Sequence, residues 1–168
     1  PWTMAGLLLG LAVGNIISDD QFKTLIAILV IVCLILLIIT GRKGDETKIP
    51  KSPVLSALAG IAAGFSSMIG NAAVPIFSVY LLARGFKKYD FMGTAAWFFL
   101  IINLIKIPLQ IFVWHSITIK TFLLTGLMLP VIAIGALSGT FIIKRMNEKV
   151  FRYFIIGLTA ITAIRLLF

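Results

Sequence analysis

Long apolar stretches, separated by short segments that carry nearly all the charge, dominate this sequence. A bilayer core about 30 Å thick is crossed by about 20 helical residues, and several stretches reach that length. No stretch alternates polar and apolar residues over the roughly ten positions that a membrane β-strand needs. The sequence therefore predicts an all-α integral membrane protein, a helical bundle. The six stretches run over residues 2–17, 24–40, 54–83, 91–114, 121–143 and 150–168.

The composition excludes several other classes of protein. Apolar residues make up 60% of the chain and charged residues 12%, and the mean hydropathy is +1.10, whereas soluble domains average about 45–50% apolar and about 25% charged residues. A cytosolic enzyme, a disordered chain and a secreted disulfide scaffold are excluded. The net charge of +9 indicates contact with lipid headgroups rather than nucleic acid, because basic residues collect in the cytoplasmic loops of membrane proteins. All carboxylates lie between the apolar stretches, at Asp19, Asp20, Asp45, Glu46, Asp90 and Glu148.

Signatures of catalysis and metal binding are missing from the sequence. Cys33 and His115 are the only residues of their types, which excludes an internal disulfide, a cysteine cluster and a site built from several histidines. We find no Walker loop, dinucleotide fingerprint or nucleophile–base pair. The sequence predicts a multi-pass protein of the cell (inner) membrane that is not an enzyme and binds no cofactor or metal. The lipid bilayer is one partner, and a homo-oligomer is left open.

The third apolar stretch is unusually long. As one straight helix, residues 54–83 would extend about 45 Å, more than a bilayer core needs. Gly70, Asn71 and Pro75 lie near its middle, where Gly and Asn tolerate left-handed backbone and Pro lacks a donor. Two interpretations remain: one tilted and kinked helix, or a re-entrant hairpin of two half-helices with a break between Ile69 and Pro75.

The basic residues of the loops favour the hairpin. If the third stretch crosses the membrane once, eight loop Lys and Arg lie on one face and five on the other. If it re-enters, the loops at residues 41–53, 84–90 and 144–152 share a face that carries eleven, and only Lys23 and Lys120 lie opposite. Because basic residues concentrate on the cytoplasmic side, we expect these three loops to be cytoplasmic.

An internal similarity agrees with this topology. The first two stretches resemble the last two, residues 10–14 with 135–139 and residues 22–29 with 151–158. With a re-entrant hairpin the two copies have opposite orientations, an inverted repeat of the kind common in secondary transporters. We expect a single transmembrane domain over residues 1–168, lacking an N-terminal part. Residues 1–40 would end its first repeat and residues 54–168 would form its second.

Glycines recur at every fourth residue in the apolar stretches. This spacing allows membrane helices to approach closely, which is a simpler explanation than contact with a substrate. We therefore predict roles in helix packing for Gly10, Gly14, Gly135 and Gly139.

Three parts of the chain carry motifs that occur together in one family of membrane proteins. Residues 64–75 resemble a glycine-rich break followed by Val-Pro, although residues 70–73 read Gly-Asn-Ala-Ala where many members have three glycines. Asn103 and Lys106 match an Asn-x-x-Lys pattern, and residues 130–145 resemble the penultimate span and basic turn. Together these motifs resemble the TauE/SafE family of sulfite and organosulfonate exporters. The resemblance covers nearly the whole chain and implies export of anions across the cell membrane.

Lys106 is the leading candidate for binding an anion. It lies about 5 Å from the centre of the fourth stretch at helical rise, and ionisable residues at that depth usually face a cavity or a partner. The alternative is snorkelling toward the headgroups. Asn103 and Gln110 fall near Lys106 on the helix surface, which indicates an inward polar stripe. Since no Asp or Glu lies within the apolar stretches, we expect an anionic substrate to supply the negative charge that neutralises Lys106.

The predicted break in the third stretch adds further candidates. The N–H groups at the start of the returning half-helix carry partial positive charge and bind anions. The side chains near the break add hydroxyl and amide donors, unless these groups serve only to satisfy the broken backbone. The predicted substrate-binding residues are Lys106, Asn103, Ser66, Ser67, Gly70, Asn71 and Ala72, and the break itself is assigned to Gly70, Asn71 and Pro75.

These features predict a secondary transporter of a small anion, such as sulfite or a sulfonate, that works by alternating access. A passive anion channel is the first alternative, because the same Lys106 and half-helix dipole would set its selectivity. The second alternative is a non-transporting membrane assembly subunit, whose glycine stripes would pack against partner helices.

Overall fold

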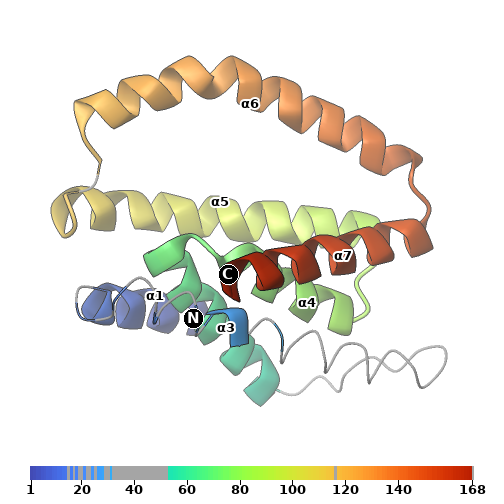
Figure 1. Ribbon diagram of the computed structural model, residues 1–168, viewed down its shortest axis with the longest axis horizontal. Helices are drawn as coiled ribbons and strands as arrows, with labels where there is room; N and C mark the ends of the chain where they lie inside the picture. Colours follow the sequence, from blue (N-terminus) through green and yellow to red (C-terminus); the bar gives the residue numbers. More distant parts are fainter. Residues whose placement is uncertain are drawn as a thin grey trace.

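Every secondary-structure element in the described part of the chain is an α-helix (Figure 1). The computed structural model describes residues 1–14, 53–115 and 117–167, together with residues 16, 18, 21, 24, 26–28 and 31. The second predicted stretch therefore lies mostly outside the described residues. The helices are α1 (Trp2–Val13), α3 (Pro53–Gly70), α4 (Ala73–Ala83), α5 (Lys88–Phe112), α6 (Ile119–Arg145) and α7 (Glu148–Leu167).

Three of these helices are long and apolar enough to cross a membrane: α3, α5 and α6. Helices α1 and α4 are apolar but shorter. At 1.5 Å per residue the 11 residues of α4 extend only about 16 Å, roughly half the thickness of a bilayer core. The all-helical, membrane-spanning character predicted from the sequence is confirmed.

The long third stretch forms two helices rather than one. Helix α3 ends at Gly70 and α4 begins at Ala73, so the interruption falls within the interval that the sequence indicated. The hydroxyl groups of Ser56, near the start of α3, and Tyr80, near the end of α4, lie 3.0 Å apart. Because the far ends of the two helices meet, the chain reverses direction at the break.

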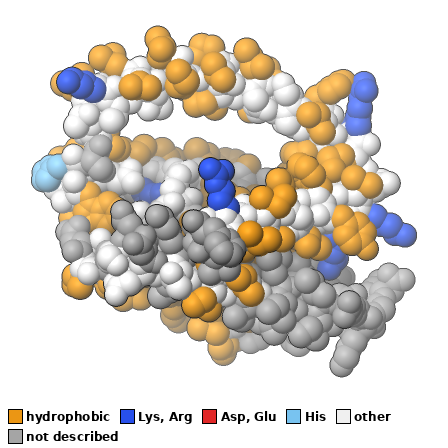
Figure 2. Space-filling model, viewed as in Figure 1, with side chains coloured by type: hydrophobic (Ala, Val, Ile, Leu, Met, Phe, Trp, Pro, Cys, Tyr) orange, Lys and Arg blue, Asp and Glu red, His pale blue; other side chains and the backbone are white. Residues whose placement is uncertain are grey.

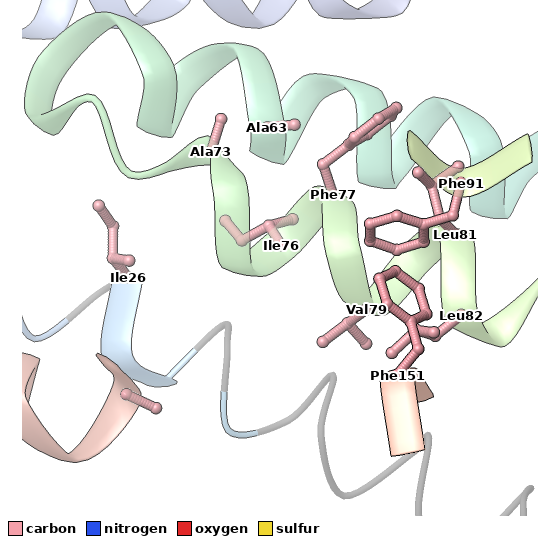
Figure 3. Packing of buried hydrophobic residues seen from close by; sticks show 11 residues of the cluster. Ile26, Ala63, Ala73, Ile76, Phe77, Val79, Leu81, Leu82, Phe91 and Phe151 are labelled. Carbon is pink, nitrogen blue, oxygen red and sulfur yellow. The ribbon is translucent and has the colours of Figure 1, made fainter. Parts of the chain in front are cut away.

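Helix α4 lies at the centre of the packed helices. Eight of its residues are buried, and it supplies most of the main apolar cluster (Figure 3). Phe77 stacks on Phe98 of α5 with ring centroids 3.6 Å apart. Phe91 of α5 meets Phe151 of α7 edge to face at 5.3 Å. These aromatic contacts join α5 to both α4 and α7.

Glycines allow α1 and α3 to pack with their backbones in contact. A Cβ atom on Gly6 would overlap the backbone of Ile61, and one on Gly64 would overlap that of Thr3. Small residues at such positions let membrane helices approach closely and gain dispersion contacts. The close contact with α1 thus supports the part of α3 that leads to the break.

A reciprocal pair of caps joins the ends of α5, α6 and α7. Lys88 is only 7% exposed, and its ammonium donates to the carbonyl of Met146 at 2.7 Å and to that of Lys144 at 3.4 Å. The Glu148 carboxylate accepts from the backbone N–H of Lys88 at 2.8 Å. A cation thus stabilises the negative C-terminal end of α6, and an anion stabilises the positive N-terminal end of α5.

Helix α6 has no buried residue, although it is long and apolar. It arches over α5 and is joined to the other helices at its two ends (Figure 1). Apolar side chains are distributed along its length on the visible face (Figure 2). The hydroxyl groups of Thr125, Ser138 and Thr140 donate to carbonyls one turn back in the same helix. These polar groups therefore have partners without water, as a helix in lipid requires.

The contact between α1 and α3 gives a prediction about stability. We expect Gly64→Ala to lower the free energy of unfolding by about 1–3 kcal/mol, because the added methyl group overpacks a helix interface. The matched control is Gly126→Ala in α6, where no atom of the described residues lies within 4 Å of an added Cβ. The control should be neutral or slightly stabilising. Thermal unfolding in detergent measures both, and equal midpoints for the two variants would contradict the packing assignment.

Candidate functional site

The Lys106 side chain lies at the break between α3 and α4. It is only 4% exposed. Its ammonium group donates to the backbone carbonyl of Ser67 at 2.5 Å, to the Asn71 Oδ1 at 3.0 Å and to the Ser67 hydroxyl at 3.3 Å. An ammonium has three N–H donors, so these three oxygens match its full donor capacity. This geometry favours a buried, bonded lysine over one that snorkels to the headgroups.

The Ser67 carbonyl accepts from Lys106 because α3 ends early. The last four carbonyls of a helix have no intrahelical donor, and α3 ends at Gly70. At the break, the N–H of Ala72 bonds to the Ser66 carbonyl at 3.0 Å and not to that of Ser67. The Lys106 ammonium therefore acts as a C-terminal cap for α3, where a cation is also favoured by the helix dipole.

Asn71 forms the turn that separates the two helices. Its φ angle is +52°, in the left-handed region that asparagine tolerates better than most residues. Gly70 is the last residue of α3, and Ala72 is the N-cap of α4. Pro75 lies within the first turn of α4 rather than in the gap, a position where its fixed φ suits a helix and its missing donor costs little.

The start of α4 presents backbone N–H groups near the break. Ala72, its N-cap, provides no side-chain cap, and the first N–H groups of a helix carry partial positive charge. Ser66 and Ser67 are 0% and 2% exposed, and the Ser66 hydroxyl has no hydrogen-bond partner among the described residues. The region thus combines a cation, helix N–H groups and an unpartnered buried hydroxyl.

The other polar residues predicted on α5 lie differently. Asn103 is exposed, and the described residues give its side chain no hydrogen bond. Gln110 is half-buried. The structure thus brings Lys106 together with Ser67 and Asn71 but does not bring Asn103 to the same contacts. The sequence had indicated one inward stripe for all three α5 residues.

The glycines predicted to pack helices fall into two groups. A Cβ on Gly10 would lie 2.9 Å from that of Met68 in α3, and one on Gly14 would lie 2.6 Å from the Trp114 ring. Nothing in the described chain lies within 4 Å of a Cβ added to Gly135 or Gly139 in α6. For these two, a packing role stays a prediction.

One partner of Lys106 was missed by the sequence interpretation. From the sequence, we consider only the N–H groups that the break frees at the start of α4. The break also frees carbonyls at the end of α3, and one of these, the Ser67 carbonyl, binds Lys106. The signal was present, because every interrupted helix exposes both ends. Across the described ranges, no three His, Cys, Asp or Glu side chains come together, so the chemistry of this site is that of lysine, hydroxyl, amide and backbone groups.

Comparison with protein families identifies the chain. The model of the sulfite exporter TauE/SafE family matches residues 1–166. The chain belongs to this family. Comparisons with curated proteins and with solved structures gave no match. The protein is accordingly a multi-pass membrane transporter rather than an enzyme, as the sequence predicted, and its family transports sulfite-like anions.

The capping of α3 by Lys106 leads to a prediction about local stability. We expect Lys106→Met to speed backbone hydrogen exchange around the Ala72 N–H, because loss of the cap lets the last turn of α3 fray. The control is Lys120→Met, since Lys120 is exposed at the start of α6. Exchange measured by mass spectrometry on residues 66–76 tests this. Equal exchange in the two variants would show that Lys106 does not stabilise the break.

Proposed function

We propose that this protein is a secondary transporter that moves a small anion, such as sulfite or a sulfonate, across the cell membrane by alternating access around the break between α3 and α4. The observation that carries the proposal is the buried Lys106 ammonium, bonded to Ser67 and Asn71 at that break. A cation inside a membrane is costly, at roughly 2.5–3.5 kcal/mol on insertion scales, and usually marks a substrate path.

The chemistry around the break suits an oxyanion. The Lys106 ammonium would supply the charge, and the Ser67 hydroxyl, which both donates and accepts, would supply a hydrogen bond. The N–H groups that begin α4 and the Ser66 hydroxyl would bind further oxygens. The proposed substrate-binding set remains Lys106, Ser66, Ser67, Gly70, Asn71 and Ala72, with Asn103 in a lesser role.

We also propose that α3 and α4 form a re-entrant hairpin within an inverted repeat. The contact between Ser56 and Tyr80 supports it, because it brings the start of α3 to the end of α4. The short length and deep burial of α4 agree, since irregular backbone at membrane depth is tolerated only inside protein or beside a water-filled cavity. The contact between Lys88 and the carbonyl of Met146 brings two of the three predicted cytoplasmic loops together.

The topology predicts which loops react with reagents added outside the cell. In a Cys33→Ser background, cysteines introduced at Lys48, Lys87 and Lys149 should resist an impermeant thiol reagent in intact cells and react after lysis. A cysteine at Lys120 should react in intact cells, because it lies on the opposite face. External labelling at Lys87 alone would show that the third stretch crosses the membrane, and would remove the inverted repeat.

The proposed role of Lys106 predicts the effect of its replacement on transport. Lys106→Ala should reduce uptake of labelled sulfite into proteoliposomes to background while the protein still inserts. Lys106→Arg should restore only part of the activity, because a planar guanidinium does not replace a compact ammonium. Asn103→Ala should have a smaller effect, since a neutral hydrogen bond contributes about 0.5–1.5 kcal/mol net.

Lys120→Ala serves as the control for the loss of one positive charge and should transport normally. Unchanged uptake by Lys106→Ala would overturn the assignment of the site. Channel-like currents through the purified protein in planar bilayers would instead contradict the carrier mechanism and favour a channel built from the same residues.

A further inference from the structure

The three acceptors of Lys106 leave its ammonium group fully hydrogen-bonded without any anion. The Ser67 carbonyl, the Ser67 hydroxyl and the Asn71 Oδ1 use its three N–H donors. An arriving anion must therefore displace one of these oxygens before it can bind Lys106 directly. The affinity of the site for an anion therefore depends on which of the three oxygens is displaced.

Two of the acceptors belong to a residue that is held in place. Ser67 is 2% exposed and lies within the last turn of α3, so its carbonyl is fixed by the helix backbone. That carbonyl is also the closest of the three oxygens to the ammonium, at 2.5 Å. The Ser67 hydroxyl can rotate and can donate to an anion as readily as it accepts from Lys106. Ser67 is thus compatible with the anion-bound site.

Asn71 differs from Ser67 in its exposure and in the part of the chain that holds it. It is exposed and lies in the two-residue connection between α3 and α4. Its bond to Lys106 is made by a side chain, which can turn away without moving a helix. Because an ammonium only donates, the carboxamide must present its oxygen to Lys106. That oxygen is a neutral acceptor in the place where a charged oxygen would bind more strongly.

We propose that Asn71 contributes to the anion site as an internal competitor for the Lys106 ammonium, and not as a ligand of the bound anion. In the anion-free protein, the Asn71 Oδ1 accepts a hydrogen bond from the Lys106 ammonium. When the substrate binds, one of its oxygens replaces the Asn71 Oδ1 as the acceptor of that bond. This inference rests on the proposed function and deepens it. Asn71 sets the affinity for the anion, and its release uncouples the α3–α4 connection from α5 at the moment the site is loaded.

The left-handed backbone of Asn71 determines which variants are informative. Gly and Asp both tolerate φ near +52°. Asn71→Gly removes the competing oxygen while it relaxes the turn. Asn71→Asp keeps the size of the side chain and replaces the neutral oxygen with a charged one that binds Lys106 more strongly. Asn71→Ala would mix loss of the amide with backbone strain.

The test combines anion binding with stability measured in the absence of anion. Equilibrium dialysis of the purified protein with labelled sulfite should show about tenfold tighter binding by Asn71→Gly than by the wild type, and at least tenfold weaker binding by Asn71→Asp. Without sulfite, the effect of Asn71→Gly on the thermal midpoint is measured twice, once in the wild type and once in the Lys106→Met variant. The midpoint should fall by about 2–4 °C more in the wild type, where Lys106 is present to bond Asn71. This coupling measures the contact between the two side chains independently of any ligand.

Asn147→Gly is the matched control, because it makes the same change at another helix junction. The Asn147 Oδ1 accepts from the backbone N–H of Val150 at 2.8 Å. This variant should lose some stability through its cap and leave the sulfite dissociation constant unchanged. If it tightens sulfite binding as much as Asn71→Gly does, general loosening explains the effect and the proposal is overturned.

The remaining outcomes separate this inference from the proposed function. If the wild type binds sulfite, Lys106→Met does not, and Asn71→Gly binds no more tightly than the wild type, the anion site stands and Asn71 is not its competitor. If the wild type binds neither sulfite nor methanesulfonate but Asn71→Gly binds one of them, the competitor role is supported. If neither protein binds either anion, the proposed function and this inference both fail.

Discussion

The hydrogen bonds from the Lys106 ammonium to the end of α3 connect the elements of the site. Backbone groups inside a membrane must find partners within the protein, because no water is available to them. The chain interrupts a helix at Asn71 and so frees carbonyls on one side and N–H groups on the other. Lys106 reaches from α5 to one of those carbonyls and to the residue that forms the turn. The break between α3 and α4 is therefore stabilised by a side chain from another helix, α5.

The packing around the break explains how an irregular backbone is kept in a single arrangement. Helix α4, too short to cross a bilayer, has most of its residues buried and contributes the largest share of the apolar cluster. Phe77 and Phe91 join it, through α5, to α7. On the other side, Gly6 and Gly64 allow α1 to contact the backbone of α3. The two helix ends that meet at Asn71 are thus supported by neighbours, while Asn71 itself remains exposed.

Much of this arrangement follows from local chemistry that is visible in the sequence. Gly70, Asn71 and Pro75 within an over-long apolar run predicted an interruption, and a single lysine deep in a span predicted an inward-facing charge. The position of Asn103, and which of the free α3 carbonyls binds Lys106, could not be predicted in the same way. Residues three apart on a helix point about 60° away from each other, so whether Asn103 faces inward with Lys106 depends on where neighbouring helices lie. Which free group binds the lysine depends equally on tertiary packing, and no periodicity encodes that.

The Lys106 ammonium has a hydrogen-bond acceptor for each of its three N–H groups, but these acceptors do not neutralise its positive charge. Two neutral oxygens of Ser67 and one of Asn71 meet its donors, but neutral dipoles do not cancel a unit charge. The apolar stretches contain no Asp or Glu that could do so. In the proposed exchange, an anion would replace the Asn71 oxygen, so that one hydrogen bond would take the place of another and the buried cation would be neutralised. The free energy of binding would then come from charge rather than from the number of hydrogen bonds. On this proposal the site would favour small oxyanions over neutral ligands of the same shape, since only a charged ligand would neutralise Lys106.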